Sequence, residues 1–148
     1  MEYARTIRRF ASQVDRAIAE KRWKLSGAVL SAAVVRMEDA AVAFSAARDR
    51  ALLAQLSPTI AKQVNRTLLG VERQLTRPQG LATRPWFRNL IYAADENNGY
   101  ATMVLPSINE AIRLGNEAIV EREIADLVQR FDAATRVLQM ATGLLQKN

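Results

Sequence analysis

The sequence contains neither cysteine nor histidine, and each absence narrows the chemistry that is open to the chain. Without cysteine there is no disulfide framework, and the redox compartment stays undetermined. Without histidine, a zinc site would have to consist of carboxylates alone, and a serine or threonine nucleophile would lack its usual base. A complete small hydrolase would therefore have to work with paired carboxylates or a lysine base.

Long apolar runs are also absent, since no stretch approaches the roughly 18 residues needed to span a bilayer. Residues 1–30 show no apolar core followed by a small-residue cleavage site, so no signal peptide is visible. With 148 residues, of which 49% are hydrophobic and 24% charged, the chain has the composition of one folded domain. Met1 begins directly inside a helical pattern, and we expect residues 1–148 to be one domain of a longer protein.

Apolar residues recur at helical spacing in four stretches, while the alternating pattern of β-strands is essentially absent. We therefore predict an all-α fold, a four-helix bundle with one long crossover loop that carries a short extra helix. Core packing is the default role of the stripes, although each could also be a coiled-coil seam. The stripes are Tyr3, Ile7, Phe10, Val14 and Ile18; Leu30, Val34, Met37, Ala41 and Phe44; Ile60, Val64, Leu68, Val71 and Leu75; and Ile124, Val128, Phe131, Leu138, Ala141 and Leu145.

Helix boundaries follow from capping residues and prolines. Ser57-Pro58 is a helix start, with serine as N-cap and proline at the first helical position. It separates a second helix over about residues 26–56 from a third over about residues 58–76. The last helix is predicted from Glu117 to about residue 146.

The long crossover runs from about Arg77 to Leu105, and a short helix follows it. Pro106 and the capping-box spacing of Ser107 and Glu110 predict the start of that helix. Gly115-Asn116 predicts its end.

The segment from residue 84 to residue 100 holds four of the nine aromatic residues of the chain. A loop of this length in a compact bundle is usually functional or disordered, and its aromatic residues argue against disorder. The run Asp95-Glu96-Asn97-Asn98 has the side chains of a hard-cation site but lacks the EF-hand spacing. We interpret it as a solvated turn in which Asn98-Gly99 supplies positive φ.

The net charge is +6, and basic residues are densest at Lys21-Arg22-Trp23-Lys24. A solvated face of arginine-rich helices explains this excess. The alternative is a basic helical module that binds nucleic acid or an anionic surface, although no groove-reading motif or phosphate loop supports it. Trp23 could touch a membrane surface or pack at a helix junction, and we favour the junction.

The predicted second helix carries apolar residues beyond its main stripe, which widens its buried arc beyond one neighbour and favours oligomerisation. These extra residues are Val29, Ala32, Ala33, Val35 and Val42.

Several short motifs between residues 71 and 113 together resemble one known family. The chain is similar there to the transferrin-receptor-like dimerisation domain, the C-terminal helical domain of the glutamate carboxypeptidase II group of zinc peptidases. Outside residues 71–113 the similarity lies only in the helix pattern. The motifs are Val71-Glu72-Arg73, Gly80-Leu81, Arg84-Pro85-Trp86-Phe87-Arg88, Leu90-Ile91-Tyr92-Ala93, Asn98-Gly99-Tyr100-Ala101 and Pro106.

The resemblance implies a homodimer and a parent chain that also carries an apical domain and a catalytic domain with two zinc ions. It implies no catalytic residue, metal ligand or cofactor in this chain, no contact with nucleic acid or membrane, and an extracytoplasmic parent. In the peptidases, the long loop reaches the catalytic cleft, where an asparagine followed by a Lys-Tyr pair helps to bind the C-terminal acidic residue of the substrate.

Three residues of this sequence match that substrate-binding motif in position. The asparagine corresponds to Asn98 and the tyrosine to Tyr100, whereas Gly99 stands in the place of the lysine. A phenol can donate one hydrogen bond to a carboxylate, while lysine adds a full charge. The resemblance therefore implies a substrate-binding loop with altered specificity, or a parent that is an inactive relative.

Overall fold

The computed structural model describes residues 2–147, and the side chains from residue 4 onward, so the predicted stripe residue Tyr3 lies outside the described side chains. The chain forms five helices and one small hairpin in this part, and the predicted all-α class is confirmed. The elements are α1 (Glu2–Glu20), α2 (Ala28–Leu53), α3 (Pro58–Gln74), β1 (Tyr92–Ala94), β2 (Thr102–Val104), α4 (Pro106–Arg113) and α5 (Glu117–Leu145).

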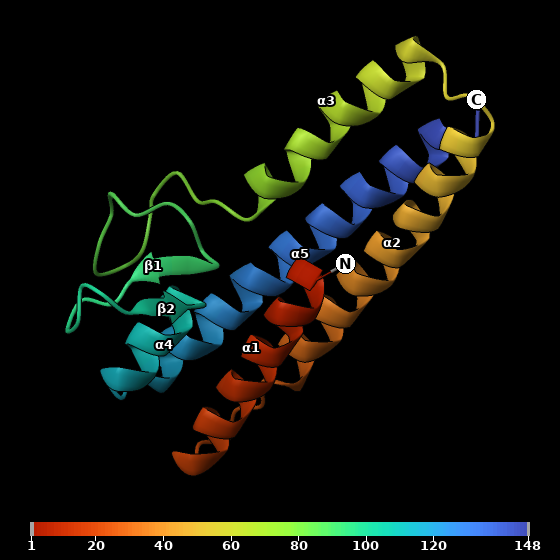
Figure 1. Ribbon diagram of the computed structural model, residues 1–148. Coiled ribbons are helices and arrows are strands. Elements are labelled where there is room, and N and C mark those ends of the chain that lie inside the picture. The colour runs from red at the N-terminus through yellow and green to blue at the C-terminus, as the bar shows by residue number, and fades with distance from the viewer. Residues whose placement is uncertain (1, 148) are drawn as a thin grey trace.

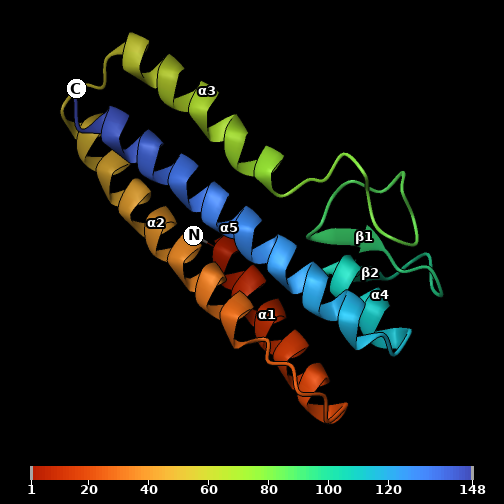
Figure 2. The same cartoon turned by 180° about the vertical axis from the view of Figure 1, so that it is seen from behind.

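Helices α2 and α5 run side by side in the same direction and form the long axis of the molecule (Figure 1). Helix α1 packs on α2 and α4 at one end, and α3 packs on α5 at the other. The view from behind shows α2 and α5 on the near side, with α1 behind them (Figure 2). The segment between α3 and α5 contains β1, β2 and α4. It lies at the same end of the bundle as α1.

The α2–α5 contact combines large and small buried side chains. Phe131 and Leu127 of α5 are fully buried, and so are Ala33 and Leu30 of α2. Small residues allow two helix backbones to approach closely, while the large ones fill the space between them. Burying a side chain of the size of Phe131 stabilises the fold by about 1.5–3 kcal/mol.

The predicted helix boundaries are largely confirmed. Ser57 is the N-cap of α3 and Pro58 occupies its first turn. Helix α4 ends just before Gly115, whose φ of +68° lies in the left-handed region that glycine adopts easily. Asn116 then caps α5, because its side chain accepts a hydrogen bond from the Ile119 amide at 3.1 Å.

The predicted capping box of α4 is wrong. The helix begins at Pro106 with Leu105 as N-cap residue, two positions earlier than a Ser107 cap would require. The Glu110 carboxylate does not reach back to the helix start, because it accepts hydrogen bonds from Thr83 and Arg84 of the crossover. Spacing alone therefore misassigned Glu110, which fixes the loop instead of the helix end.

The hairpin of β1 and β2 was not predicted. Its antiparallel register pairs Tyr92 with Val104 and Ala94 with Thr102. Each strand has only three residues, which is too short for a recognisable alternation. This hairpin places the segment between Ala94 and Thr102 at the outer end of the crossover (Figure 1).

Candidate substrate-contacting loop

The crossover between α3 and α4 is anchored to the helices by its own apolar residues. Leu81, Leu90 and Ile91 are almost completely buried in the core of the bundle. Tyr92 meets Phe10 of α1 edge to face, with ring centroids 5.9 Å apart. Such aromatic pairs are worth about 0.5–1.5 kcal/mol beyond the area they bury. The predicted order of this aromatic segment therefore has a physical basis in the structure.

Gly80 allows the crossover to fold back on itself. Its φ of +68° is in the left-handed region, and a Cβ built there would lie 2.0 Å from the Pro85 carbonyl oxygen. Only glycine fits this close approach of two backbone segments. The turn brings Arg77 and Gly80 together, since the Arg77 Nε donates to the Gly80 carbonyl at 2.8 Å.

A buried ion pair joins the crossover to α4. Arg84 and Glu110 are both buried, and the Arg84 Nη2 donates to the Glu110 carboxylate. The Arg84 Nη1 also donates to the Ala94 carbonyl at 2.6 Å, and its guanidinium lies 5.0 Å from the centroid of the Phe87 ring. Arg84 thus connects α4, the end of β1 and the aromatic segment through one side chain. Removal of either charge would leave the other buried without its counterion.

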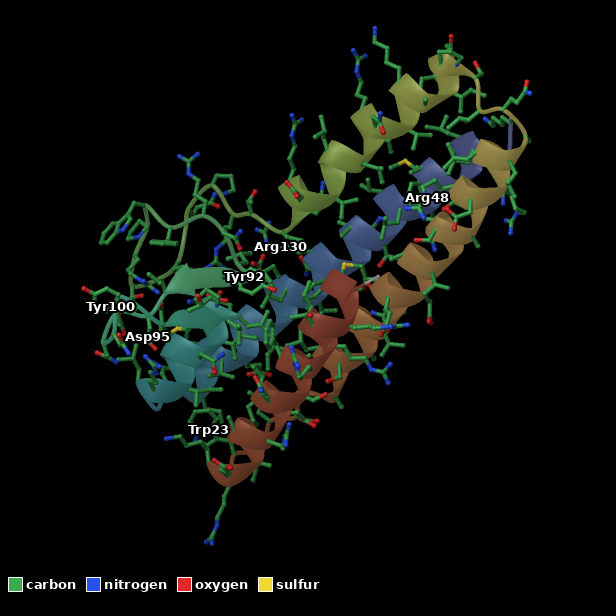
Figure 3. The ribbon with its side chains drawn as sticks, viewed as in Figure 1. Trp23, Arg48, Tyr92, Asp95, Tyr100 and Arg130 are labelled. Atoms are coloured by element: carbon green, nitrogen blue, oxygen red, sulfur yellow. The ribbon has the colours of Figure 1, made fainter. Side chains whose placement is uncertain are left out.

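A second ionic cluster joins the start of the crossover to α5. The Arg77 Nη1 lies 2.7 Å from the buried carboxylate of Glu123 and 3.1 Å from that of Asp126. The Arg130 Nε donates to Asp126 at 2.8 Å, and its Nη1 donates to the Thr76 carbonyl at 2.7 Å. Both arginines therefore hold the chain where it leaves α3 (Arg130 is labelled in Figure 3).

The segment between the two strands, residues 95–101, forms the tip of the crossover. Its base is closed by Asp95, whose amide donates to the Ala101 carbonyl at 2.9 Å. The Asp95 carboxylate accepts hydrogen bonds from both terminal nitrogens of Arg113 on α4, at 3.0 and 2.6 Å, and from the Asn97 amide at 2.9 Å. The Arg113 hydrogen bond, followed by the Asn97 amide, holds the pKa of the Asp95 carboxyl well below its usual value of 3.8. Asp95 thus stays ionised and ties the tip to α4.

The three predicted substrate-binding residues lie together on this tip. Tyr100 is fully exposed and its side chain extends away from the helices (Figure 3). Its amide donates to the Asn98 side chain at 3.3 Å, and the Ala101 amide donates to the Asn98 carbonyl at 2.9 Å. Asn98 therefore shapes the turn that carries Tyr100.

The predicted positive φ at Asn98-Gly99 is wrong. Among the described residues, Gly80 and Gly115 are the glycines with positive φ, so Gly99 is not one of them. Asn98 does not have a positive φ either. A Cβ at Gly99 would meet no atom within 4 Å. The backbone therefore does not require glycine at position 99, and a side chain there would point into open space.

The described residues contain no group of three acidic side chains that could hold a metal ion. The Asp95-Glu96-Asn97-Asn98 run is accordingly a turn closed by Arg113. The two zinc ions that the family resemblance implies find no ligand set here, and we assign no residue of this chain to them. In the described part of the chain, no helix has the length and apolar character to cross a bilayer.

Among the described residues, nine arginines form ion pairs with acidic side chains of the same chain, so much of the basic charge is paired within it. Trp23 packs in part against the core near the α1–α2 turn, which agrees with the helix-junction interpretation (Figure 3). The arginines are Arg5, Arg8, Arg36, Arg48, Arg77, Arg84, Arg113, Arg122 and Arg130.

The residues that position the tip were not among the predicted site residues. Arg84 and Glu110 lie 26 positions apart, and Asp95 and Arg113 lie 18 apart, so neither pair follows a local spacing rule. One feature of the sequence could have indicated the Arg84–Glu110 pair. Glu110 lies on the buried face of α4, and a buried carboxylate needs a partner of opposite charge.

The fold is that of a helical module that presents a loop. It is all-α, with a long ordered crossover that ends in an exposed hairpin tip. The model of the transferrin receptor-like dimerisation domain family matches residues 25–139, which is most of the chain. The chain therefore belongs to this family of dimerisation domains.

One similar protein is "Probable glutamate carboxypeptidase LAMP1" of Arabidopsis thaliana. It is 35% identical over 51 residues, which are 34% of this chain and 8% of that protein. The chain thus matches only a small part of a much longer relative.

Proposed function

We propose that this chain is the homodimerisation module of a larger glutamate-carboxypeptidase-like protein and that its tip completes the substrate cleft of a neighbouring catalytic domain. The dimerisation part rests on the family match over residues 25–139. In this proposal the parent also has an apical domain, and its two zinc ions belong to the catalytic domain. The module itself performs no chemistry.

The single observation that carries the cleft role is the combination of exposure and fixation at Tyr100. The side chain is fully exposed, yet its hairpin is tied to α4 through Asp95 and Arg113. A loop that presents a polar aromatic side chain from a fixed base loses little entropy when it contacts a ligand. The Tyr100 hydroxyl would donate one hydrogen bond to the terminal carboxylate of a peptide.

Tyr100→Phe in the full-length protein tests the cleft role. The substitution keeps the ring and removes the hydroxyl, so it removes one hydrogen bond to a charged group. We expect the KM for peptides with a free C-terminal carboxylate to rise about tenfold while kcat changes little. The matched control is Trp86→Phe, a change at another exposed aromatic residue of the crossover. An unchanged KM in Tyr100→Phe would exclude the tyrosine from the cleft.

Gly99→Lys tests the specificity half of the proposal. A lysine at position 99 fits the backbone, because a Cβ there meets no atom within 4 Å. Its ammonium would add a charge beside Tyr100 and should raise the preference of the full-length protein for an acidic C-terminal residue by about tenfold. Equal activity on acidic and neutral C-terminal residues in both proteins would contradict this assignment.

A further inference from the structure

Helix α2 carries a second apolar stripe on the side opposite to the core. Seven of its eight positions are exposed, and Val35 is half-buried. Successive members are spaced four and three residues apart in strict alternation, the pattern of a coiled-coil seam. We call this set the outer stripe: Ala28, Ala32, Val35, Asp39, Val42, Ala46, Asp49 and Leu53.

The core stripe of the same helix also alternates in steps of three and four residues and lies on the opposite side; it consists of Leu30, Ala33, Met37, Ala40, Phe44, Ala47 and Ala51. Its members, from Leu30 through Met37 and Phe44 to Ala51, are all buried against the rest of the bundle. No member of the outer stripe belongs to the hydrophobic core among the described residues. Helix α2 thus has two seams on opposite sides, and one of them lacks an occupant within the described chain.

The exposed sides of α1 and α3 differ from the outer stripe of α2. Exposed positions of α1 include Arg5, Arg9, Arg16 and Glu20, and those of α3 include Lys62, Arg66, Glu72 and Arg73. In the outer stripe of α2, six of eight residues are Ala, Val or Leu. In the view from behind, no other helix passes in front of α2 (Figure 2).

We propose that the outer stripe of α2 is the homodimer interface and that the same stripe of a second copy occupies it in antiparallel register. This inference rests on the proposed function, since membership in a dimerisation family makes a second copy the expected occupant. The spacing is identical when it is read in either direction. A two-fold axis between residues 40 and 41 therefore brings every stripe position onto another stripe position, as a closed symmetric dimer requires.

The two carboxylates in the outer stripe select the antiparallel direction. In a parallel pair, Asp39 and Asp49 would each face their own copy across the seam, and like charges in contact are unfavourable. In the antiparallel register, Asp39 lies opposite the partner's Val42, and Asp49 lies opposite the partner's Ala32. No carboxylate then faces another.

A groove beside the outer stripe gives the partner helix additional room. It lies between α2 and α5, has a volume of about 470 Å³ and is lined in part by Asp39, Ala43 and Gly143. A Cβ at Gly143 would meet no atom within 4 Å, so this wall of the groove is flat. The groove thus leaves the flank of the outer stripe next to α5 open to a partner helix.

Charge substitutions at Val42 test the interface by light scattering over a range of concentrations. Val42→Glu places a carboxylate opposite the partner's Asp39 at two symmetric sites, and we expect the dissociation constant to rise about a hundredfold. Val42→Lys places an ammonium opposite the same carboxylate and should stay within about tenfold of the unsubstituted chain. The matched control is Leu69→Glu on α3, which should not change the dissociation constant, because Leu69 is exposed there to 59%.

The outcomes separate the interface from the dimer itself. If the unsubstituted chain is a dimer and Val42→Glu remains equally dimeric, the outer stripe is not the interface, although dimerisation stands. Equal losses in Val42→Glu and Val42→Lys would overturn the register. A strict monomer at high micromolar concentration would overturn both proposals. Unchanged far-ultraviolet circular dichroism and melting temperature establish that each variant is folded.

Disulfide trapping provides a second readout of the register, since the chain has no cysteine of its own. Val35 lies opposite the partner's Ala46, so Val35→Cys with Ala46→Cys should form a covalent dimer on oxidation. The single variants should not, because each residue lies about 16 Å along the seam from its own copy. A disulfide needs Cα atoms within about 7 Å. Efficient crosslinking by a single variant would overturn the antiparallel register.

Discussion

Between α2 and α5 the fully buried side chains are apolar and the Arg36–Asp132 ion pair is partly exposed, whereas buried arginine–carboxylate pairs fix the crossover to α4 and α5. Phe131 and Leu30 represent the first region, and both are fully buried. Arg84 with Glu110 represents the second, and both side chains are also buried. Apolar packing tolerates changes that keep volume, while a buried ion pair requires both partners. The helices can therefore vary in sequence more freely than the few residues that position the tip.

The largest expected effect comes from a cavity in the helical body. Phe131→Ala should lower the free energy of unfolding by about 4 kcal/mol, because it removes a buried ring from between the long helices. Chemical denaturation followed by circular dichroism measures this loss. Phe131→Leu is the matched control and should cost less than half as much. A loss below about 1 kcal/mol in Phe131→Ala would contradict the assigned core.

Breaking the ion pair of the crossover should cost slightly less and act more locally. Glu110→Ala leaves the Arg84 guanidinium buried without its counterion, and we expect a loss of about 3 kcal/mol. Hydrogen exchange should increase in residues 81–105 more than in α5. The double variant Arg84→Met/Glu110→Leu, which removes both charges, should recover part of this loss. Equal exchange in all elements would contradict a local role for the pair.

Gly80 tests the turn by which the crossover folds back. Gly80→Ala places a Cβ against the Pro85 carbonyl. It also puts alanine at a φ of +68°, a conformation that residues with a side chain disfavour. We expect a loss of about 2 kcal/mol. Gly143→Ala is the control, because it adds the same Cβ at a helical position in open space and should be neutral or slightly stabilising. A neutral Gly80→Ala would contradict the backbone approach described above.

The smallest effect on stability is expected at the tip. Asp95→Asn removes the charge that Arg113 and the Asn97 amide hold, and amide exchange in residues 95–101 should become about tenfold faster. Overall stability should hardly change, because the tip contributes little to the core. Exchange that is unchanged at the tip would show that the Asp95–Arg113 pair does not order it.

The pH dependence of the tip follows from the same pair. Because the folded-state pKa of Asp95 lies below its ordinary value of 3.8, its contribution is complete above that value and is lost as the pH falls below it. The Asp95 carboxyl signal in NMR should therefore not titrate between neutral pH and the ordinary value. A midpoint at or above 3.8 would contradict the pairing with Arg113.

The four longer helices were predictable because each carries a long periodic signal, and several helices have chemically distinct ends. Ser57-Pro58 and Gly115-Asn116 marked boundaries that the structure confirms. The hairpin was not predictable, since three-residue strands show no periodicity. The partners of Glu110 were hidden for another reason, because its spacing from Ser107 matched a local motif while its contacts are tertiary.

The placement of Asn98, Gly99 and Tyr100 on one exposed tip agrees with the aromatic, turn-ended sequence. The tip that carries Tyr100 is tied to α4 by Asp95 and Arg113, a tertiary contact between residues 18 positions apart that no local pattern reveals. The outer stripe of α2 was partly visible in the sequence as extra apolar residues, of which Ala32, Val35 and Val42 belong to it. Its separation from the core became clear only when the buried side of α2 was known.

The mass of the unsubstituted chain in solution tests its role in dimerisation most directly. Light scattering over increasing concentration should show a transition to twice the 16.5 kDa of one chain. A mass that stays at 16.5 kDa up to high micromolar concentration would contradict dimerisation by this module.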